Sequence, residues 1–339
     1  MKYVTIKDIA NELGISKSTV SRALSGDSHN VSKETVRKVI ETAEEMGYRK
    51  NEMAVNLRHR SSKTIGIVVP ESVTSFYMQF TSKVQKLLQL QGYRVILALS
   101  DEDFLTERSN FEMFDKYRVD GILISSCHNK ANLEFYNSFI KRGIPLVFFD
   151  RTVSGLDCSN VRSDDYRSAF FLMEHLIYNG YKRILHLAGP DYIRNTEERL
   201  RAYCDTLKKH GIPYDPDLVI RTGVNEEDGE AAMNNFLSSA PPSGKCDALF
   251  CFTEMQALGA KRVLQQHGIR IPEEIAIVCM SGTRLSTLVH PAITAVEQPV
   301  EQMADEAVRL LLNKIEDHAS PSENIVLPAK MIIRESSQD

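Results

Sequence analysis

A short stretch near the N-terminus is rich in side chains that bind nucleic acid. Lys17 and Ser18 begin a predicted helix, and Arg22 follows one turn later. A guanidinium can hold guanine O6 and N7 through two hydrogen bonds, and a lysine reaches the same acceptors. Hydroxyl groups suited to phosphate oxygens, which position a protein on DNA, lie nearby: Thr5, Ser16, Thr19 and Ser21. The alternative is a three-helix bundle whose exposed cations are simply solvated.

Three short helices are predicted to carry these residues. An apolar stripe at helical spacing follows Thr5, which we expect to cap a first helix that ends at Gly14. Ser16 caps the second helix, and a third is expected from residue 32 to residue 46. Because only Gly14, Ile15 and Ser16 separate the first two helices, they must cross sharply. This predicts a helix-turn-helix, whose second helix enters the major groove of DNA.

Two segments carry a likeness to a known family: TIKDIA at residues 5–10 and GISKSTVSRAL at residues 14–24. In one register they resemble the head of the LacI/GalR (lactose/galactose repressor) family, with its pattern T-I-x-D-V-A-x-x-A-G-V-S-x-x-T-V-S-R-x-L. The resemblance implies a DNA-binding transcriptional regulator. It also implies that Lys17, Ser18 and Arg22 occupy operator-reading positions.

The segment after the third predicted helix resembles the hinge of the same family, G-Y-x-P-N-x-x-A-R-x-L. The resemblance implies a helix that forms on the operator, with Leu57 wedged into the minor groove, Ala54 one turn before it and Asn51 as the N-cap. Lys50 replaces the usual proline, which loosens the entry to the hinge, and Val55 replaces the usual arginine. The alternative is that Leu57 is an ordinary apolar residue of a linker helix.

Beyond the hinge, strand-like and helical stretches alternate twice. In the first half, strands at 65–69, 92–97, 120–124 and 144–149 alternate with helices at 80–90, 107–117 and 133–141. In the second half, helices at 166–179, 197–210, 227–237 and 257–267 alternate with strands at 183–188, 217–221, 248–252 and 275–280. Residues 291–299 are expected to return the chain, 300–315 to form a helix and 324–334 a closing strand pair. Such alternation is typical of doubly wound parallel sheets, which bind ligands beyond the carboxyl ends of their strands.

The body also resembles the LacI/GalR family, for example in IGIVVP at residues 65–70 and IPLVFFDR at residues 144–151. Bodies of this family are similar to periplasmic sugar-binding proteins, which have two lobes. The predicted fold class is therefore an all-α helix-turn-helix head followed by an α/β two-lobed body with two doubly wound parallel sheets. The expected boundaries are a head at 1–48, a hinge at 49–62, an N-terminal lobe at 63–162 and 292–322, and a C-terminal lobe at 163–291 and 323–339.

The family resemblance also implies residues that contact a small effector between the lobes. Phe76 and Tyr77 occupy the positions of cleft aromatics, whose faces suit a sugar ring. Asp150 ends a predicted strand, where its carboxylate can accept two hydroxyl donors, and Arg199 could clamp hydroxyls or a carboxylate. The alternatives are aromatic packing for Phe76 and Tyr77, a turn cap for Asp150 and a structural ion pair for Arg199.

Two further effector positions depart from the family pattern. Ser281 stands where an aspartate commonly binds effector hydroxyls, and Thr253 stands where an asparagine is common. The loss of the aspartate removes a negative charge from the expected cleft. An acidic or otherwise unusual effector is one interpretation, and corepression through a partner protein is another.

Several function classes lack their motifs in this sequence. No G-x-G-x-x-G or Walker A loop follows a predicted strand, and neither G-x-S-x-G nor H-E-x-x-H is present. We therefore expect no enzyme activity, no cofactor and no metal. The six cysteines have no C-x-x-C spacing, so we expect reduced thiols. No apolar run approaches the length of a membrane helix and the N-terminus does not read as a signal peptide, so the expected location is cytoplasmic.

The charge distribution divides the chain as the motifs do. Residues 1–63 contain 12 Lys and Arg against 8 Asp and Glu, whereas the remainder contains 29 against 37. A basic head on an acidic body is expected of a nucleic-acid module joined to a different one. The family resemblance implies, in addition, a homodimeric repressor of carbohydrate-utilisation genes that binds a pseudo-palindromic operator and a sugar-like effector. A cytoplasmic sugar-binding protein or a sugar-metabolising enzyme without a DNA role remains the alternative.

Overall fold

The computed structural model describes residues 4–25, 31–48, 61–71, 75–239 and 246–338. The chain forms two compact units, Met1–Ser61 and Ser62–Asp339. The predicted hinge residues Asn51, Ala54 and Leu57 lie outside the described residues. Their roles therefore stay predictions.

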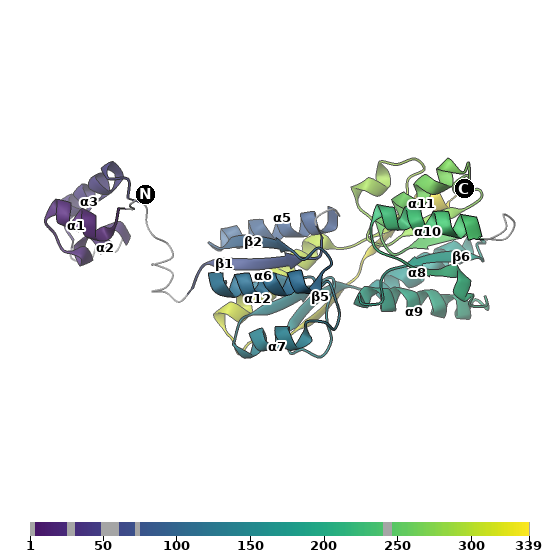
Figure 1. Ribbon diagram of the computed structural model, residues 1–339, viewed down its shortest axis with the longest axis horizontal. Helices are drawn as coiled ribbons and strands as arrows, with labels where there is room; N and C mark the ends of the chain where they lie inside the picture. Colours follow the sequence, from purple (N-terminus) through teal and green to yellow (C-terminus); the bar gives the residue numbers. More distant parts are fainter. Residues whose placement is uncertain (1–3, 26–30, 49–60, 72–74, 240–245, 339) are drawn as a thin grey trace. The chain divides into compact units, whose positions relative to one another are not determined.

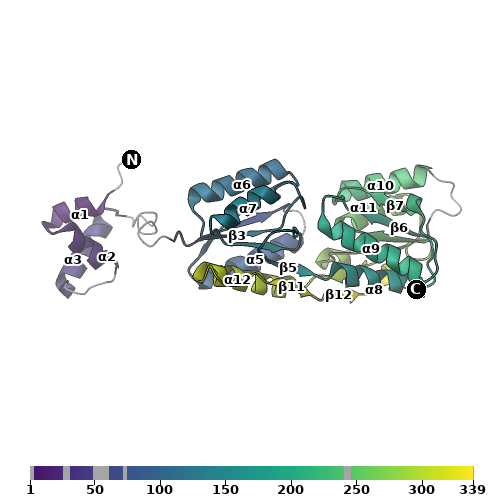
Figure 2. The ribbon, with the colours of Figure 1, turned by 90° about the horizontal axis from the view of Figure 1, so that it is seen from below.

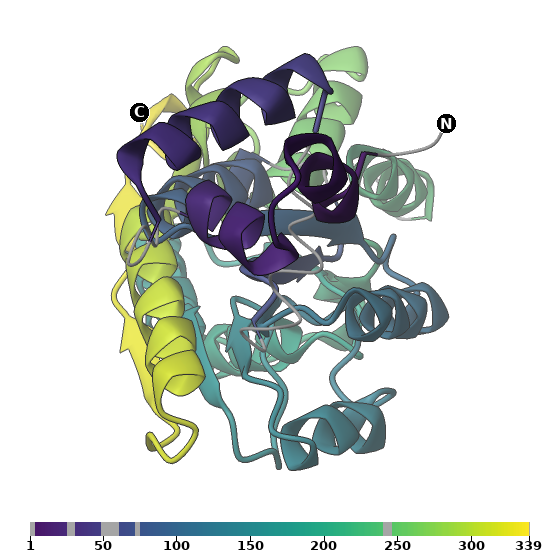
Figure 3. The same cartoon turned by 90° about the vertical axis from the view of Figure 1, so that its left-hand side faces the viewer.

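The first unit contains the three predicted helices, α1 (Ile6–Leu13), α2 (Lys17–Ser25) and α3 (Lys33–Glu45). Figure 3 shows the long α3 lying beside the two shorter helices. Their apolar faces meet in a small core, in which Ile9, Val20 and Val39 are fully buried. The helix periodicity read from the sequence is therefore confirmed for this unit.

Two local features set the helix boundaries of this unit. The Thr5 hydroxyl accepts a hydrogen bond from the Asp8 backbone N–H, and the Asp8 carboxylate accepts one from the Thr5 N–H at 2.8 Å, which completes a capping box. Gly14 ends α1 in the left-handed region at φ +63°, where a side chain would be strained. Two residues later, the Ser16 hydroxyl accepts the Thr19 N–H at 3.1 Å and begins α2.

The second unit contains two lobes, each built on one sheet (Figures 1 and 2). The sheet of the N-terminal lobe is parallel, with the order β11-β5-β4-β3-β1-β2. One face packs on α5 and α12 and the other on α6 and α7, because alternate strand residues point to opposite faces. The bounds are β1 Thr64–Val69, α5 Ser75–Leu90, β2 Arg94–Leu99, α6 Phe104–Tyr117, β3 Gly121–Ile124, α7 Leu133–Lys141, β4 Leu146–Phe149, β5 Ser159–Ser163, α12 Val300–Glu316 and β11 Asn324–Leu327.

The sheet of the C-terminal lobe has the order β12-β10-β9-β8-β6-β7, and only the edge pair β10 and β12 is antiparallel among its described pairings. Helices α10 and α11 cover one face, and α8 and α9 cover the other. The bounds are α8 Asp165–Tyr178, β6 Ile184–Ala188, α9 Arg194–Lys209, β7 Val219–Arg221, α10 Glu226–Ser239, β8 Ala248–Cys251, α11 Glu254–Gln266, β9 Ala276–Cys279, η2 Arg284–Thr287, β10 Thr294–Glu297 and β12 Lys330–Ile332. The predicted fold class is confirmed, with one antiparallel edge strand added.

The segments that cross between the lobes differ from the prediction. Strand β5 was not predicted, because Ser159–Ser163 contains a single apolar residue, Val161. The expected closing pair at 324–334 is wrong, because β11 pairs with β5 in one lobe and β12 pairs with β10 in the other. Residues 292–322, expected in the N-terminal lobe, contribute β10 to the C-terminal sheet. Residues 323–339, expected in the C-terminal lobe, contribute β11 to the N-terminal sheet.

None of the helices in the described part of the chain combines enough length with enough apolar character to cross a bilayer.

Candidate functional site

Helix α2 presents the residues that the sequence assigns to DNA. Lys17, Ser18 and Arg22 are exposed, whereas Val20 and Ala23 on the opposite side are buried in the helical core. Within the described residues, the Lys17 and Arg22 side chains make no ion pair or hydrogen bond. Both cations are therefore available to a ligand on the outer face of α2.

The four hydroxyl residues of the same unit have different environments. The Thr5 hydroxyl donates to the Asp8 carboxylate at 2.7 Å, and the Ser16 hydroxyl lies 2.7 Å from that of Ser18 and 2.8 Å from that of Thr19. Thr19 and Ser21 are half-buried. Thr5 and Ser16 thus already act as helix caps, and any phosphate contact that they make comes in addition.

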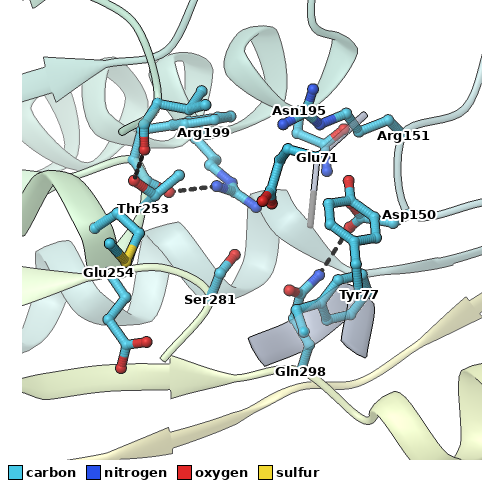
Figure 4. A pocket seen from close by; sticks show the side chains of 14 residues that line it. Glu71, Tyr77, Asp150, Arg151, Asn195, Arg199, Thr253, Glu254, Ser281 and Gln298 are labelled. Atoms are coloured by element: carbon cyan, nitrogen blue, oxygen red, sulfur yellow. Dashed lines mark hydrogen bonds between the residues drawn. The ribbon is translucent and has the colours of Figure 1, made fainter. Parts of the chain in front are cut away.

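The body contains a pocket between the two lobes, which we call the interlobe pocket (Figure 4). Its empty space measures about 530 Å³, a volume that includes open solvent. Its walls include all six residues that the family resemblance assigns to an effector: Phe76, Tyr77, Asp150, Arg199, Thr253 and Ser281. The structure therefore brings the six together, from both lobes. Their contact with an effector stays a prediction.

Asp150 organises the N-terminal wall of the pocket. It follows β4 directly and has a φ of +56°, a left-handed conformation that is uncommon outside glycine. Its carboxylate accepts the Tyr77 hydroxyl at 3.0 Å and the Gln298 amide at 3.0 Å. Burial raises the pKa of Tyr77 well above its ordinary value, so the hydroxyl stays a donor. Asp150 is thus held in place by two donors at the pocket wall.

The two aromatic residues of this wall belong both to the pocket and to the core. Phe76 and Tyr77 are 5% and 4% exposed, and their rings meet edge to face at a centroid distance of 5.0 Å. Both rings join the apolar cluster beneath α5 that contains Phe80 and Phe149. The alternative for this pair, aromatic packing in the core, is therefore observed, and the same two residues also line the pocket.

Arg199 organises the C-terminal wall. Its Nε donates to one oxygen of Asp165 at 2.8 Å, its Nη2 forms an ion pair with the same oxygen at 2.6 Å, and its Nη1 donates to the Phe252 carbonyl at 2.5 Å. The guanidinium lies over the Phe252 ring at 4.2 Å, and Asn195 donates to the other Asp165 oxygen at 3.0 Å. These bonds leave one donor on each terminal nitrogen of Arg199 for a ligand. The structural ion pair, the alternative for Arg199, is present, and the same pair orients its remaining donors.

Asp165 and Asn195 were missed by the sequence analysis, although both support Arg199. Burial raises the pKa of Asp165 to about 6, against the opposing charge of Arg199. A partial signal was present in the sequence, since Asp165 directly precedes the helix expected at 166–179, where an acidic residue is favoured. Nothing in the sequence pairs it with a residue on another helix.

Thr253 and Ser281 reach the pocket in different ways. Thr253 is the N-cap of α11, and its hydroxyl accepts the Gln256 N–H at 3.1 Å and donates to the Val224 carbonyl at 2.7 Å. Ser281 has a φ of +58°, and its hydroxyl has no hydrogen-bond partner among the described residues. Ser281 therefore has a free hydroxyl for a ligand, whereas the Thr253 hydroxyl already has partners.

The charges around the pocket argue against the expectation of an acidic effector. Glu71 and Asp150 both line the pocket. The cations are neutralised, since Arg199 pairs with Asp165, and Arg151 donates to both Glu102 oxygens at 2.8 Å. The pocket wall therefore keeps carboxylates although position 281 is a serine.

The described residues contain no group of three or more His, Cys, Asp or Glu side chains that could hold a metal ion, and their six cysteines are free thiols. Burial raises the pKa of Cys127, Cys251 and Cys279, which disfavours the reactive thiolate.

Comparisons with known proteins match both parts of the chain. A family model described as "Bacterial regulatory proteins, lacI family" matches residues 5–51, and one described as "Periplasmic binding protein-like domain" matches residues 173–337. The ribose operon repressor of Halalkalibacterium halodurans is 26% identical, with 98% of this chain and 97% of that protein covered. Catabolite control protein A of Priestia megaterium is 29% identical, with 99% of each chain covered.

Solved structures agree with these relatives. The transcriptional regulator CelR in complex with cellobiose is 29% identical with a TM-score of 0.74, and the match covers 98% of this chain and 99% of that chain. The lac repressor dimer bound to operator and the anti-inducer ONPF covers 100% of both chains with a TM-score of 0.85, and at 22% identity it supports the fold alone. On the matched head, the matched body and the nearly full-length alignments, the chain belongs to the LacI family of bacterial regulatory proteins.

Proposed function

We propose that this protein is a sequence-specific, operator-binding repressor of carbohydrate-utilisation genes, and that a neutral sugar or sugar derivative in the interlobe pocket switches its affinity for DNA. The relatives named above are repressors or control proteins, one of them of a ribose operon, and one structural neighbour holds cellobiose. Helix α2 supports the DNA-binding half of the proposal, because Lys17 and Arg22 are exposed and unpaired.

The observation that carries the switching half is the composition of the interlobe pocket. Asp150 lies on the wall formed by the N-terminal lobe and accepts a hydrogen bond from the buried Tyr77. Arg199 lies on the wall formed by the C-terminal lobe and is bonded to the buried Asp165. A ligand that bonds to both walls binds best in one arrangement of the lobes, and it shifts the population toward that arrangement. This is the property that a small-molecule switch requires.

The proposal includes a homodimer, a pseudo-palindromic operator and no enzymatic activity. Two copies of the head would read two half-sites related by the symmetry of the dimer. Within the interlobe pocket, the ionisable side chains are engaged in pairs that orient them, such as Arg199 with Asp165, and none forms a nucleophile–base pair. Binding without turnover is the role that this arrangement supports best.

The test uses the full-length chain and the DNA upstream of its own gene. Fluorescence anisotropy should show tighter binding to this DNA than to a scrambled duplex at the same salt concentration. Thermal-shift screening with neutral sugars, sugar acids and sugar phosphates should reveal a stabilising sugar, because a ligand of the folded state raises the melting temperature. Equal affinity for both duplexes would point to a sugar-binding protein without a DNA role, and turnover of a sugar would point to an enzyme.

A further inference from the structure

A second pocket adjoins the interlobe pocket and also lies between the lobes. We call it the outer pocket; it encloses about 760 Å³, part of it open to solvent. Phe76, Ser281 and Gln298 line both pockets and form their common boundary. The outer pocket continues from this boundary along Gln79, Arg284 and Thr287. A ligand that fills the interlobe pocket therefore has a second compartment beside it.

The common boundary offers polar atoms that have no partner. The Ser281 hydroxyl lacks a hydrogen-bond partner in the described part of the chain. The Gln298 amide nitrogen donates to Asp150 at 3.0 Å and to Ser163 at 3.3 Å, whereas its amide oxygen has no partner there. Figure 4 shows Ser281 and Gln298 along one side of the interlobe pocket. A hydroxylated chain or ring that passes between the pockets would satisfy both groups.

The far side of the outer pocket is polar and is anchored to the protein core. Arg284 and Gln79 are exposed, and among the described residues neither side chain makes an ion pair or a hydrogen bond. The loop that carries Arg284 is fixed by Glu254, whose carboxylate accepts the Thr283 and Ser286 N–H groups at 2.8 Å each. The backbone that carries Arg284 is thus fixed by this loop, and the backbone of Gln79 by helix α5, which lowers the cost of ordering these donors around a ligand.

We propose that the effector is longer than one sugar ring: a disaccharide or comparable glycoside, with one ring in the interlobe pocket and the second in the outer pocket. The inference rests on the proposed function and specifies its ligand class. The first ring lies between Asp150 and Arg199. The glycosidic link passes the common boundary beside Ser281, and hydroxyls of the second ring accept hydrogen bonds from Arg284 and Gln79.

The experiment measures affinity by calorimetry for matched sugar pairs on the full-length chain. Glucose is compared with cellobiose and maltose, galactose with lactose, and xylose with xylobiose. The two-ring member of the binding pair should bind at least about tenfold more tightly, the gain expected from about 1.4 kcal/mol of added contact. Thr287→Trp, which fills the outer pocket, should remove most of this gain and leave the affinity for the single ring unchanged.

Two further variants distinguish the filling of the outer pocket from a general disturbance of the fold. Leu288→Trp places the same bulk at the next residue, which is 66% exposed and does not line the outer pocket, and it should leave both affinities unchanged. Arg284→Ala should lower only the affinity for the two-ring sugar. Equal binding of both members of a pair, or a gain that survives Thr287→Trp and Arg284→Ala, would overturn the proposal. Binding of none of these sugars would overturn the sugar effector itself, a distinct result.

Discussion

At the scale of single residues, the proposed switch assigns its two binding sites to two arginines in opposite environments. Arg22 is exposed on α2 and has no partner among the described residues, whereas Arg199 is 2% exposed and bonded to Asp165. An exposed guanidinium without a partner keeps all its hydrogen-bond donors for a ligand, but its orientation is not fixed. A buried and paired one is fixed in orientation, which suits recognition of a small ligand.

Replacement of Arg22 tests the reading of bases by α2. Arg22→Ala should weaken operator binding by about 1–3 kcal/mol and lower the preference for operator over scrambled DNA, because a base-specific contact is lost. Anisotropy titrations at one salt concentration measure both effects. Arg37→Ala is the control, since Arg37 is an exposed arginine of α3 that pairs with Glu41 in the same unit. An unchanged preference in Arg22→Ala would remove this residue from the reading surface.

The buried pair at Arg199 predicts a pH dependence of effector binding. The pKa of Asp165 is raised from 3.8 to about 6 on folding. Its contribution to the stability of the fold is therefore fully present below pH 3.8 and is lost as the pH rises through about 6. The affinity for the effector depends on pH in the opposite direction, because only the charged form of Asp165 holds Arg199 firmly. Effector affinity should therefore fall as pH drops from 7 to 5, with a midpoint about 6. Calorimetry should find no such midpoint in Asp165→Asn; the same midpoint there would assign it to another group.

At the scale of elements, the first turn of α11 holds the loop that separates the two pockets. Glu254 is 4% exposed and accepts hydrogen bonds from the backbone and hydroxyl groups of Thr283 and Ser286. This carboxylate ties the start of η2 to α11, close to Ser281 in the chain. This side of the pockets is therefore formed by the ends of helices and strands and not by their central residues.

Glu254→Ala should destabilise the body. The substitution leaves buried donors of Thr283 and Ser286 without an acceptor, which should cost about 2–4 kcal/mol of unfolding free energy. Urea unfolding followed by circular dichroism measures the change. Glu227→Ala, an exposed glutamate in the first turn of α10, is the control and should stay within about 0.5 kcal/mol of the parent. Equal midpoints for the two variants would show that Glu254 does not anchor the loop.

The hinge adds a second element-scale prediction, which rests on the family resemblance. Leu57→Ala should reduce the bend of the operator, because the side chain expected to part a base step is removed. Energy transfer between dyes at the two DNA ends reports the bend angle. Val55→Ala changes an apolar residue of the same segment outside the expected wedge position and should leave the angle unchanged. A Leu57→Ala protein that bends DNA as the parent does would contradict the wedge.

At the scale of the whole molecule, three segments of the described chain connect the two lobes of the body. The chain passes from β5 to α8, from β10 to α12 and from β11 to β12. Each lobe keeps its own core, so the lobes can move as bodies about these crossings. A ligand that bonds across the interlobe pocket acts on this movement.

Coupling between effector and operator must be reciprocal. If the effector changes operator affinity by a given factor, saturating operator should change effector affinity by the same factor, typically about 5–150-fold. Paired calorimetry and anisotropy measurements on the parent protein test the equality. In Arg22→Ala, effector affinity should not respond to a concentration of operator that the variant no longer binds. A factor of one in both titrations of the parent would mean that the effector does not change operator affinity, which would contradict the proposed switch.

The sequence alone determined the features that depend on near neighbours along the chain. The caps at Thr5 and Ser16, the turn at Gly14 and the apolar periodicities follow from local hydrogen bonding and side-chain spacing. The family resemblance added six of the residues that line the interlobe pocket. The spacing of residues along the chain could not have shown that these six lie together.

Only the tertiary structure decided what depends on contacts between distant segments. It placed β11 and β12 in different sheets, paired Arg199 with Asp165, and left Ser281 unpartnered between two pockets. Strand partners, burial and the neutralisation of a charge arise where separate segments meet, so no local pattern encodes them. For the same reason, the serine at position 281 could not by itself show that Glu71 lines the same pocket.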